Sequence, residues 1–185
     1  MARPADPERK QQLLDDAVDY AAANGIADLS LRPLAKALGT QAPVLQHHFG
    51  SKEQLLAQIV NSTRDRVRSL GRVAEASQTR AGLNAVWEWA SEPEQFDIVR
   101  LFFETYALAL RSPERYQEFL QHVVQDWLDE PLAAVDEISA TIANATINGL
   151  LLDLLATGDR KRVNEAFART QAMLHRHADS ATGRS

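Results

Sequence analysis

Three features of the sequence predict an all-α protein. Apolar residues recur at the spacing of amphipathic helices through most of the 185 residues. Capping residues, prolines and glycines divide the chain into pieces of helix length. No stretch worth assigning to a strand alternates apolar and polar residues with a period of two. We therefore expect a chain of helices joined by short turns.

Composition narrows the class of protein. The chain has no cysteine, which excludes a disulfide framework and a thiolate metal site and fits a reducing compartment. No run approaches the roughly 20 apolar residues of a membrane span, and the N-terminal MARPADPERK lacks the apolar core of a signal peptide. We expect a soluble, cytoplasmic protein without membrane association. The net charge of -5 argues against a protein that coats nucleic acid by charge alone.

The first helix is predicted to begin at Pro7, with Asp6 as its N-cap and the proline in the first helical position. Asn24 and Gly25 end it. One face of this helix is apolar and carries Leu13, Leu14, Ala17, Val18 and Ala21. We expect it to brace the two helices that follow.

The segment from Ser30 to Phe49 predicts two short helices joined by a glycine turn. Ser30 is a plausible N-cap of the first, which Gly39 ends. The second runs from Thr40 to Phe49. Its expected buried residues are Val44, Leu45 and Phe49, while Gln41, Gln46, His47 and His48 face outward. A helix, a short glycine turn and a second helix form the unit that places its second helix in the major groove of DNA.

Charges near this unit are almost balanced. Residues 1–60 contain six Lys or Arg against seven Asp or Glu, and no Lys or Arg lies between Thr40 and Phe49. This counts against DNA binding. The acidic residues cluster on the first helix, however, while Arg32, Lys36 and Lys52 flank the second short helix. Phosphate contacts would therefore fall on these three flanking cations.

Two runs in this region carry a family resemblance. Residues 34–39, LAKALG, and residues 45–53, LQHHFGSKE, resemble the signature of the TetR/AcrR family of transcriptional regulators. The resemblance covers residues 8 to about 60. One departure is that many members carry a tyrosine and another polar residue where this chain has Gln46 and His47. A tyrosine hydroxyl would reach a phosphate, so the resemblance does not carry this contact with the DNA backbone over to Gln46 and His47.

The resemblance implies a domain organisation and a set of DNA contacts. The expected domains are a helix-turn-helix DNA-binding domain at 7–52, extending into the linking helix to about 67, a ligand-binding and dimerisation domain at 53–178, and a flexible tail at 179–185. Glutamine suits adenine through N6 and N7. The residues expected at DNA are Arg32, Lys36, Thr40, Gln41, Pro43, Gln46, His47 and Lys52. The alternative for this set is the solvated polar face of a short helix.

A longer helix is predicted to begin inside the DNA-binding domain. Ser51 and Gln54 have the spacing of a capping box, and the helix that follows extends to about Val73. Exposed amide groups at its start and the Lys52 ammonium would together form a phosphate site. Such a helix would connect the DNA-binding domain mechanically to the rest of the chain.

Prolines and capping residues predict five more helices. Their expected limits are Arg80–Ala90, Glu92–Arg111, Pro113–Leu128, Pro131–Thr157 and Arg160–His177. The middle helices are rich in aromatic residues, which form either a filled core or a ligand cavity with a few polar groups. The residues expected around a ligand are Trp87, Phe102, Phe103, Glu104, Tyr106, His122, Trp127, Asn144 and Asn148.

The helix from Pro131 to Thr157 is apolar on nearly every side and needs cover from several directions. With the last helix it resembles the two-helix surface through which members of the family dimerise. The alternative is the central helix of a monomer. The residues expected at the dimer interface are Ile147, Leu151, Leu154, Val163, Phe167, Thr170 and Leu174.

The predicted function is a homodimeric regulator of transcription and not an enzyme. The five histidines form no metal or catalytic pattern, and no nucleophile elbow, phosphate loop or dinucleotide motif occurs. No cofactor is expected. The resemblance implies binding to a palindromic operator in double-stranded DNA, repression, and release by a small-molecule effector. The alternative is a dimeric helical ligand-binding or interaction module that does not bind DNA.

Overall fold

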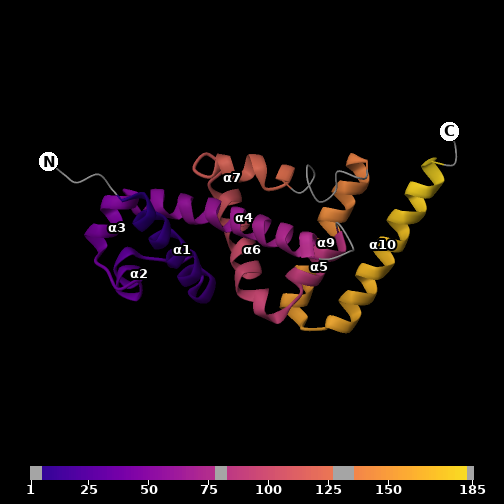
Figure 1. Cartoon of the computed structure of the whole chain (residues 1–185), viewed down its shortest axis with the longest axis horizontal. Helices are drawn as coiled ribbons and strands as arrows, with labels where there is room; N and C mark the ends of the chain where they lie inside the picture. The colour runs from indigo at the N-terminus through magenta and orange to yellow at the C-terminus, as the bar shows by residue number, and fades with distance from the viewer. Residues whose placement is uncertain (1–5, 78–82, 127–135, 183–185) are drawn as a thin grey trace. The chain divides into compact units, whose positions relative to one another are not determined.

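The computed structural model describes residues 6–77, 83–126 and 136–182, and over these residues it contains helices and no strand (Figure 1). The all-α prediction is therefore confirmed. Its N-terminal part consists of α1 (Pro7–Asn24), α2 (Leu31–Ala37) and α3 (Ala42–Phe49). These three helices pack on one another and form the predicted three-helix bundle.

Local capping accounts for the limits of α1. One carboxylate oxygen of Asp6 accepts hydrogen bonds from the backbone N–H groups of Glu8, at 3.1 Å, and Arg9, at 3.4 Å. Gly25 ends the helix with a φ of 81°. The buried residues of α1 lie on the predicted face and are Leu13, Ala17, Val18 and Ala21.

Helix α4 (Lys52–Ser77) begins at the predicted capping box. The Ser51 hydroxyl accepts a hydrogen bond from the Gln54 N–H at 3.2 Å, and the Gln54 side-chain oxygen accepts one from the Ser51 N–H at 2.8 Å. The two bonds satisfy amide groups that the first turn of a helix leaves without partners. The helix extends beyond the predicted end at Val73 and reaches Ser77.

The remaining helices are α5 (Leu83–Ala90), α6 (Phe96–Arg111), α7 (Gln117–His122), α9 (Glu137–Thr157) and α10 (Arg160–Thr182). A 3-10 turn, Pro93–Gln95, precedes α6. Helix α7 is shorter than the predicted helix Pro113–Leu128 at both ends. Residues after Ser112 form a turn, in which the Arg115 N–H donates to the Ser112 carbonyl at 3.0 Å, and a second turn at residues 123 and 124 follows the end of α7 at His122. Helix α10 continues past 179, where the tail was expected to begin.

Backbone contacts divide the chain into two units. The first combines Met1–Ser69 with Asp97–His122, and the second combines Leu70–Phe96 with Val123–Ser185. Helices α6 and α7 thus share a unit with the helix-turn-helix. The limits of these two units differ from the predicted domain boundary at 52. The predicted boundary separates two functions, and it stays a prediction.

A hydrogen bond joins α6 to the helix-turn-helix within the first unit. The Glu104 carboxylate accepts from the backbone N–H of Ile26 at 2.9 Å, in the connection between α1 and α2. A Cβ at Gly25 would lie 3.4 Å from this carboxylate. Ile26 is 2% exposed, so its amide needs a partner inside the protein. Glu104 therefore holds the connection on α6.

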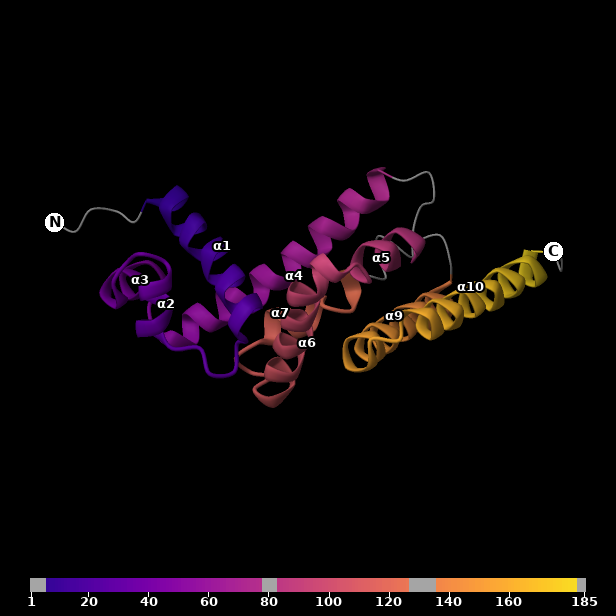
Figure 2. The same cartoon turned by 90° about the horizontal axis from the view of Figure 1, so that it is seen from below.

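The second unit is organised by the hairpin of α9 and α10, which lie side by side (Figure 2). Gly158 makes the turn between them with a φ of 69°. Trp87 of α5 stacks on Phe167 of α10 with ring centroids 4.7 Å apart, and its indole N–H donates to Asn164 at 3.0 Å. Aromatic packing and a satisfied indole fix α5 against the hairpin.

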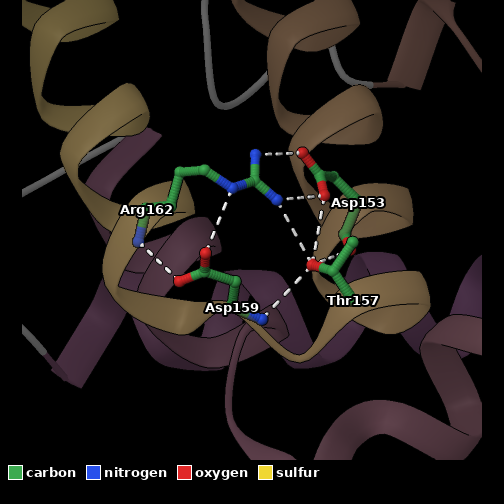
Figure 3. Close-up of polar contacts among 4 residues, drawn as sticks. All are labelled: Asp153, Thr157, Asp159 and Arg162. Carbon is green, nitrogen blue, oxygen red and sulfur yellow. Dashed lines mark hydrogen bonds and ion pairs between the residues drawn. The ribbon is translucent and has the colours of Figure 1, made fainter.

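Arg162 closes the turn between α9 and α10 with a polar network (Figure 3). Its guanidinium donates to both carboxylate oxygens of Asp153, at 2.6 and 2.7 Å, and to Asp159 at 3.2 Å. The Thr157 hydroxyl accepts a further bond from Arg162 at 3.3 Å. The hydrogen bonds from Arg162 hold the pKa of the Asp153 carboxyl below its usual range. A bidentate pair of this kind fixes the register of the two helices.

Acid should weaken this network. Because the pKa of Asp153 is lowered in the folded state, its contribution to stability is present at neutral pH and is lost as pH falls below about 4 through the folded pKa. We expect Asp153→Asn to lower the free energy of unfolding at pH 7, and the difference from wild type to shrink at pH 3.5. Urea unfolding at the two pH values measures both effects. Asp97→Asn, which removes an ion pair within one exposed turn of α6, should change little.

Among the described helices, α9 has a length and composition sufficient to cross a membrane, with a mean hydropathy of 1.4. This differs from the expectation that no run approaches a membrane span. A core helix of a soluble protein meets the same criterion, and α9 packs on α10 along one side.

Candidate nucleic-acid interface

The turn between α2 and α3 has the tight geometry of a helix-turn-helix. Gly39 has a φ of 63°, and the Thr40 N–H donates to the Ala35 carbonyl at 2.9 Å. Helix α3 then begins after Gln41 in an extended conformation, with Pro43 in the first turn, where its missing N–H costs nothing. The glycine and the proline therefore set the direction of α3 relative to α2.

Two side chains anchor α3 in the bundle. Leu45 is 0% exposed and Phe49 is 4% exposed, and their spacing of four residues makes them one stripe of the helix. Lys10 of α1 places its ammonium 5.7 Å from the centroid of the Phe49 ring. Lys10 was not among the predicted site residues, because its position beside the end of α3 depends on how α1 packs and not on local sequence.

The anchored stripe leaves the opposite side of α3 in solvent. Gln41, Gln46 and His47 are exposed, as predicted, and so is Pro43, whereas His48 was expected to face outward and is only partly exposed. His48 is half-buried, packs edge-on against His47 at 5.4 Å, and has a buried Nδ1 without a hydrogen-bond partner in the described part of the chain. These positions are compatible with base contact by Gln41, Gln46 and His47.

Val44 corrects the prediction for this helix. It was expected to be buried, yet 37% of it is exposed. Leu45 and Phe49 are the buried residues of α3, and Val44 is turned about 100° from Leu45 around the helix axis. Its side chain therefore belongs to the outward surface of α3.

Three predicted phosphate contacts flank α3. Arg32 and Lys36 are exposed on α2, and Lys52 is half-buried in the first turn of α4. Some of the amide groups at the start of α4 are already engaged. The backbone N–H of Gln54 donates to the Ser51 hydroxyl. The Glu53 carboxylate accepts hydrogen bonds from the Glu53 backbone and from the Ser51 hydroxyl, and these lower the pKa of Glu53. Part of the amide set at the start of α4 is therefore engaged within the turn, and the Lys52 ammonium stays the predicted phosphate contact.

Acidic residues gather away from α3. An open groove of about 700 Å³ is lined by α1 and α4, and it includes Asp15, Asp19 and Asp65. None of its lining residues belongs to α2 or α3. Asp19 pairs with Arg66, and Asp15 accepts a hydrogen bond from Gln11 at 2.9 Å. Asp15 and Asp19, two of the seven acids of residues 1–60, therefore lie in this groove and not on α2 or α3.

The residues expected around a ligand fall into two groups. In the first unit, Tyr106 packs edge-on against Phe102 at 6.0 Å and against Phe119 at 5.7 Å, and burial raises the pKa of its hydroxyl. Phe103 joins this cluster through Phe102 at 5.7 Å. Glu104 is engaged by Ile26. His122 is exposed and bonds through Nδ1 to the Glu118 carbonyl at 2.8 Å.

The other ligand candidates belong to the second unit. Trp87 is packed on Phe167, and Asn148 donates to Asn144 at 3.2 Å, so the two amides satisfy each other along α9. Trp127 lies outside the described residues. Within each unit most of the ligand candidates therefore already pack against, or form a hydrogen bond with, another residue of the chain.

The residues expected at a dimer interface are mostly inside the chain. Exposure is at most 7% for the five residues Ile147, Leu151, Leu154, Val163 and Phe167. Thr170 and Leu174 are half-buried, and Leu174 packs on Ala140 and Ala143 of α9. These side chains pack α9 and α10 within the chain, and their predicted role in a dimer stays a prediction.

The opposite side of α9 carries an apolar seam, which we call the α9 stripe. Its members are exposed and follow one another at alternating steps of four and three residues: Ile138, Ile142, Ala145, Gly149, Leu152 and Ala156. Ile138 is 70% exposed, and Ile142 and Leu152 are each 49% exposed. This is the heptad spacing that lets two helices pack along a common seam.

Comparisons with known proteins agree with this geometry. Residues 13–59 match the family model of bacterial regulatory proteins of the tetR family. The chain is 31% identical over 116 residues to the HTH-type transcriptional regulator BetI of Agrobacterium fabrum, covering 59% of this chain and 55% of that protein. It is 29% identical over 127 residues to BetI of Rhizobium meliloti, covering 58% and 63%. The chain thus spans somewhat over half the length of these curated relatives.

Solved structures share the whole fold. A transcriptional regulator from Rhodococcus sp. Rha1 aligns with a TM-score of 0.74 at 19% identity, over 91% of this chain and 96% of that one. The multidrug binding protein EbrR, in complex with imidazole, aligns with a TM-score of 0.69 at 24% identity, over 92% and 93%. At these identities the likeness establishes the fold.

Proposed function

Because this chain belongs to the tetR family of bacterial regulatory proteins, we propose that it is a cytoplasmic, ligand-responsive transcriptional repressor that binds a palindromic operator as a homodimer. Regulators of this family are DNA-binding proteins and not enzymes. The observation that supports DNA binding most directly is the orientation of α3. Leu45 and Phe49 hold it in the bundle, and Gln41, Val44, Gln46 and His47 face outward between the cations of α2 and α4.

The α9 stripe supports the dimer. An exposed glycine within a helix lowers helix stability by about 1 kcal/mol relative to alanine. Gly149 is such a residue, and nothing lies within 4 Å of the position its Cβ would occupy. A second helix packing closely on the stripe would use this open space, since small residues allow two backbones to approach. The stripe, in place of the residues buried against α10, is the proposed interface.

The aromatic cluster of α6 and α7 is the proposed effector site. Phe102, Tyr106 and Phe119 offer an apolar wall, and Tyr116 nearby in the chain has a buried hydroxyl with no partner among the described residues. EbrR, which shares the fold, binds imidazole and ethidium. The bond from Glu104 to Ile26 joins α6 to the helix-turn-helix directly, so an effector that moves α6 would change the affinity of α3 for the operator.

Selection from random duplex DNA tests the proposal. The full chain should enrich a palindrome whose half-sites lie about one helical turn apart, and fluorescence anisotropy should show binding that weakens steeply with salt. Light scattering on the same sample reports the oligomeric state. Flat binding curves at low salt from an intact dimer would favour the interaction module that does not bind DNA.

Lys52→Ala should weaken binding to every duplex alike. Loss of one phosphate contact reduces the slope of log K against log salt by about one unit for each DNA-binding domain of the dimer. Lys161→Ala is the matched control, since Lys161 is an exposed lysine in the first turn of α10. Anisotropy titrations at several salt concentrations measure the slope. An unchanged slope for Lys52→Ala would show that this lysine contacts no phosphate.

A further inference from the structure

The first turn of α3 has an apolar outward surface. Its residues are Ala42, Pro43 and Val44, none of which carries a hydrogen-bonding side chain. Pro43 and Val44 are exposed, and Val44 keeps 37% of its surface in solvent. Polar side chains return only in the second turn, at Gln46 and His47. The end of the helix that a helix-turn-helix directs at base edges is therefore apolar.

Packing within the chain covers most of Val44 but leaves 37% of it in solvent. Leu45 and Phe49 form the contact of α3 with the bundle and are almost fully buried. A β-branched residue has only moderate helix propensity, and the exposed part of its side chain gains nothing from the hydrophobic effect. The exposed part of Val44 is thus available to a partner outside the chain.

The chemistry of the major groove offers one apolar partner for such a side chain. Of the groups that the four bases present there, the C5-methyl group of thymine is the apolar one, and the rest are hydrogen-bond donors and acceptors. We infer that Val44 is a specificity-determining residue that recognises a thymine in each half-site through its C5-methyl group. This inference rests on the proposed function, because it requires α3 to enter the major groove.

The polar neighbours of Val44 agree with this assignment. Gln41 immediately before the helix and Gln46 in the second turn are both exposed, and glutamine suits adenine through N6 and N7. No lysine or arginine, the usual partners of guanine, lies between Thr40 and Phe49. The outward surface of α3 is therefore built for A·T pairs, with Val44 at the thymine.

Replacing thymine by uracil in the DNA isolates the methyl group. A duplex selected by the full wild-type chain is resynthesised with each dT changed to dU in turn, which leaves base pairing intact. One position in each half-site should lose about fourfold in affinity when its methyl group is removed, from the usual effect of burying one such group. The same positions should show no loss in Val44→Ser, which cannot make the contact.

The matched control is Val124→Ser. Val124 is 39% exposed and follows α7 in the chain, so Val124→Ser loses the same atoms at similar exposure in a residue that is not part of the helix-turn-helix. This variant should bind like wild type and keep the full effect of dU. If wild type binds the selected duplex tightly and no dU substitution weakens it, or if Val44→Ser keeps the same dU effects as wild type, the inference is overturned while the proposed function stands. If no duplex is bound at low salt, the proposed function and the inference both fail.

Discussion

Replacing Gly50 with alanine should lower the free energy of unfolding by about 2–4 kcal/mol, the largest effect we expect from a single methyl group in this chain. Gly50 joins α3 to α4 with a φ of 79° and a ψ of -130°, a conformation that side chains with a Cβ rarely adopt. A Cβ there would also overlap the side-chain oxygen of Gln54 and lie 3.0 Å from its Cδ. The substitution therefore strains the backbone and displaces the residue that completes the capping box of α4.

Gly39→Ala is the matched control for Gly50→Ala. Gly39 also has a positive φ, of 63°, but nothing lies within 4 Å of the position of its Cβ. It should cost only about 1 kcal/mol, the strain of the left-handed conformation. Urea unfolding followed by circular dichroism measures both variants. Equal losses for the two glycines would show that the contact with Gln54 has no part in the effect.

A double-mutant cycle separates strain from the lost cap. Gln54→Ala alone should cost about 1 kcal/mol, because it removes the side-chain oxygen that accepts the hydrogen bond from the Ser51 N–H, while the bond from the backbone N–H of residue 54 to the Ser51 hydroxyl remains. In the Gly50→Ala background the same change should cost almost nothing, since the clash has already displaced the side chain. Additive losses would contradict this coupling.

Local interactions explain which parts of the fold could be predicted from sequence. Helix capping by Asp6 with Pro7, and by Ser51 with Gln54, involves residues no more than four positions apart. These capping roles could therefore be predicted from the sequence without knowledge of the packing. The turn at Gly39 could be predicted for the same reason, because a positive φ is a property of one residue. These signals were sufficient to place the helix-turn-helix and the start of α4.

Contacts distant in sequence explain most of what could not be predicted. Glu104 was expected to face a ligand, yet it accepts a hydrogen bond from Ile26, 78 residues earlier, and no local pattern marks such a pair. Val44 was assigned to the core because the spacing of apolar residues alone could not show that Leu45 and Phe49 are buried more deeply than Val44. Leu45 and Phe49 were sufficient for the contact that the bundle allows.

The interface residues of helix α9 were difficult to predict for a similar reason. Because it is apolar on nearly every side, the sequence alone does not distinguish the residues that pack on α10 from those that remain exposed. The more apolar side was assigned to a partner, and the structure uses Ile147, Leu151 and Leu154 within the chain. The side left in solvent includes alanine and glycine, which are only weakly apolar. Together with the larger exposed residues of the α9 stripe they have the regular heptad spacing of a packing seam.

Ile142→Glu should therefore convert the dimer into a monomer. Ile142 is 49% exposed and lies near the middle of the α9 stripe. In an interface with two-fold symmetry the substitution occurs twice, and each unpaired carboxylate that must lose its water costs about 3–5 kcal/mol. The folded chain itself should keep its stability, because the new side chain lies in solvent when no partner is present.

Leu110→Glu is the matched control for this interface. Leu110 is 63% exposed at the end of α6, outside the α9 stripe, and the same change there should leave the dimer intact. Sedimentation velocity over a range of protein concentrations measures the two dissociation constants, and circular dichroism checks that both variants fold. Because two DNA-binding domains held together engage a palindrome far better than one, Ile142→Glu should also lose most of its operator affinity. A dimer that survives Ile142→Glu with an unchanged dissociation constant would show that the α9 stripe is not the interface.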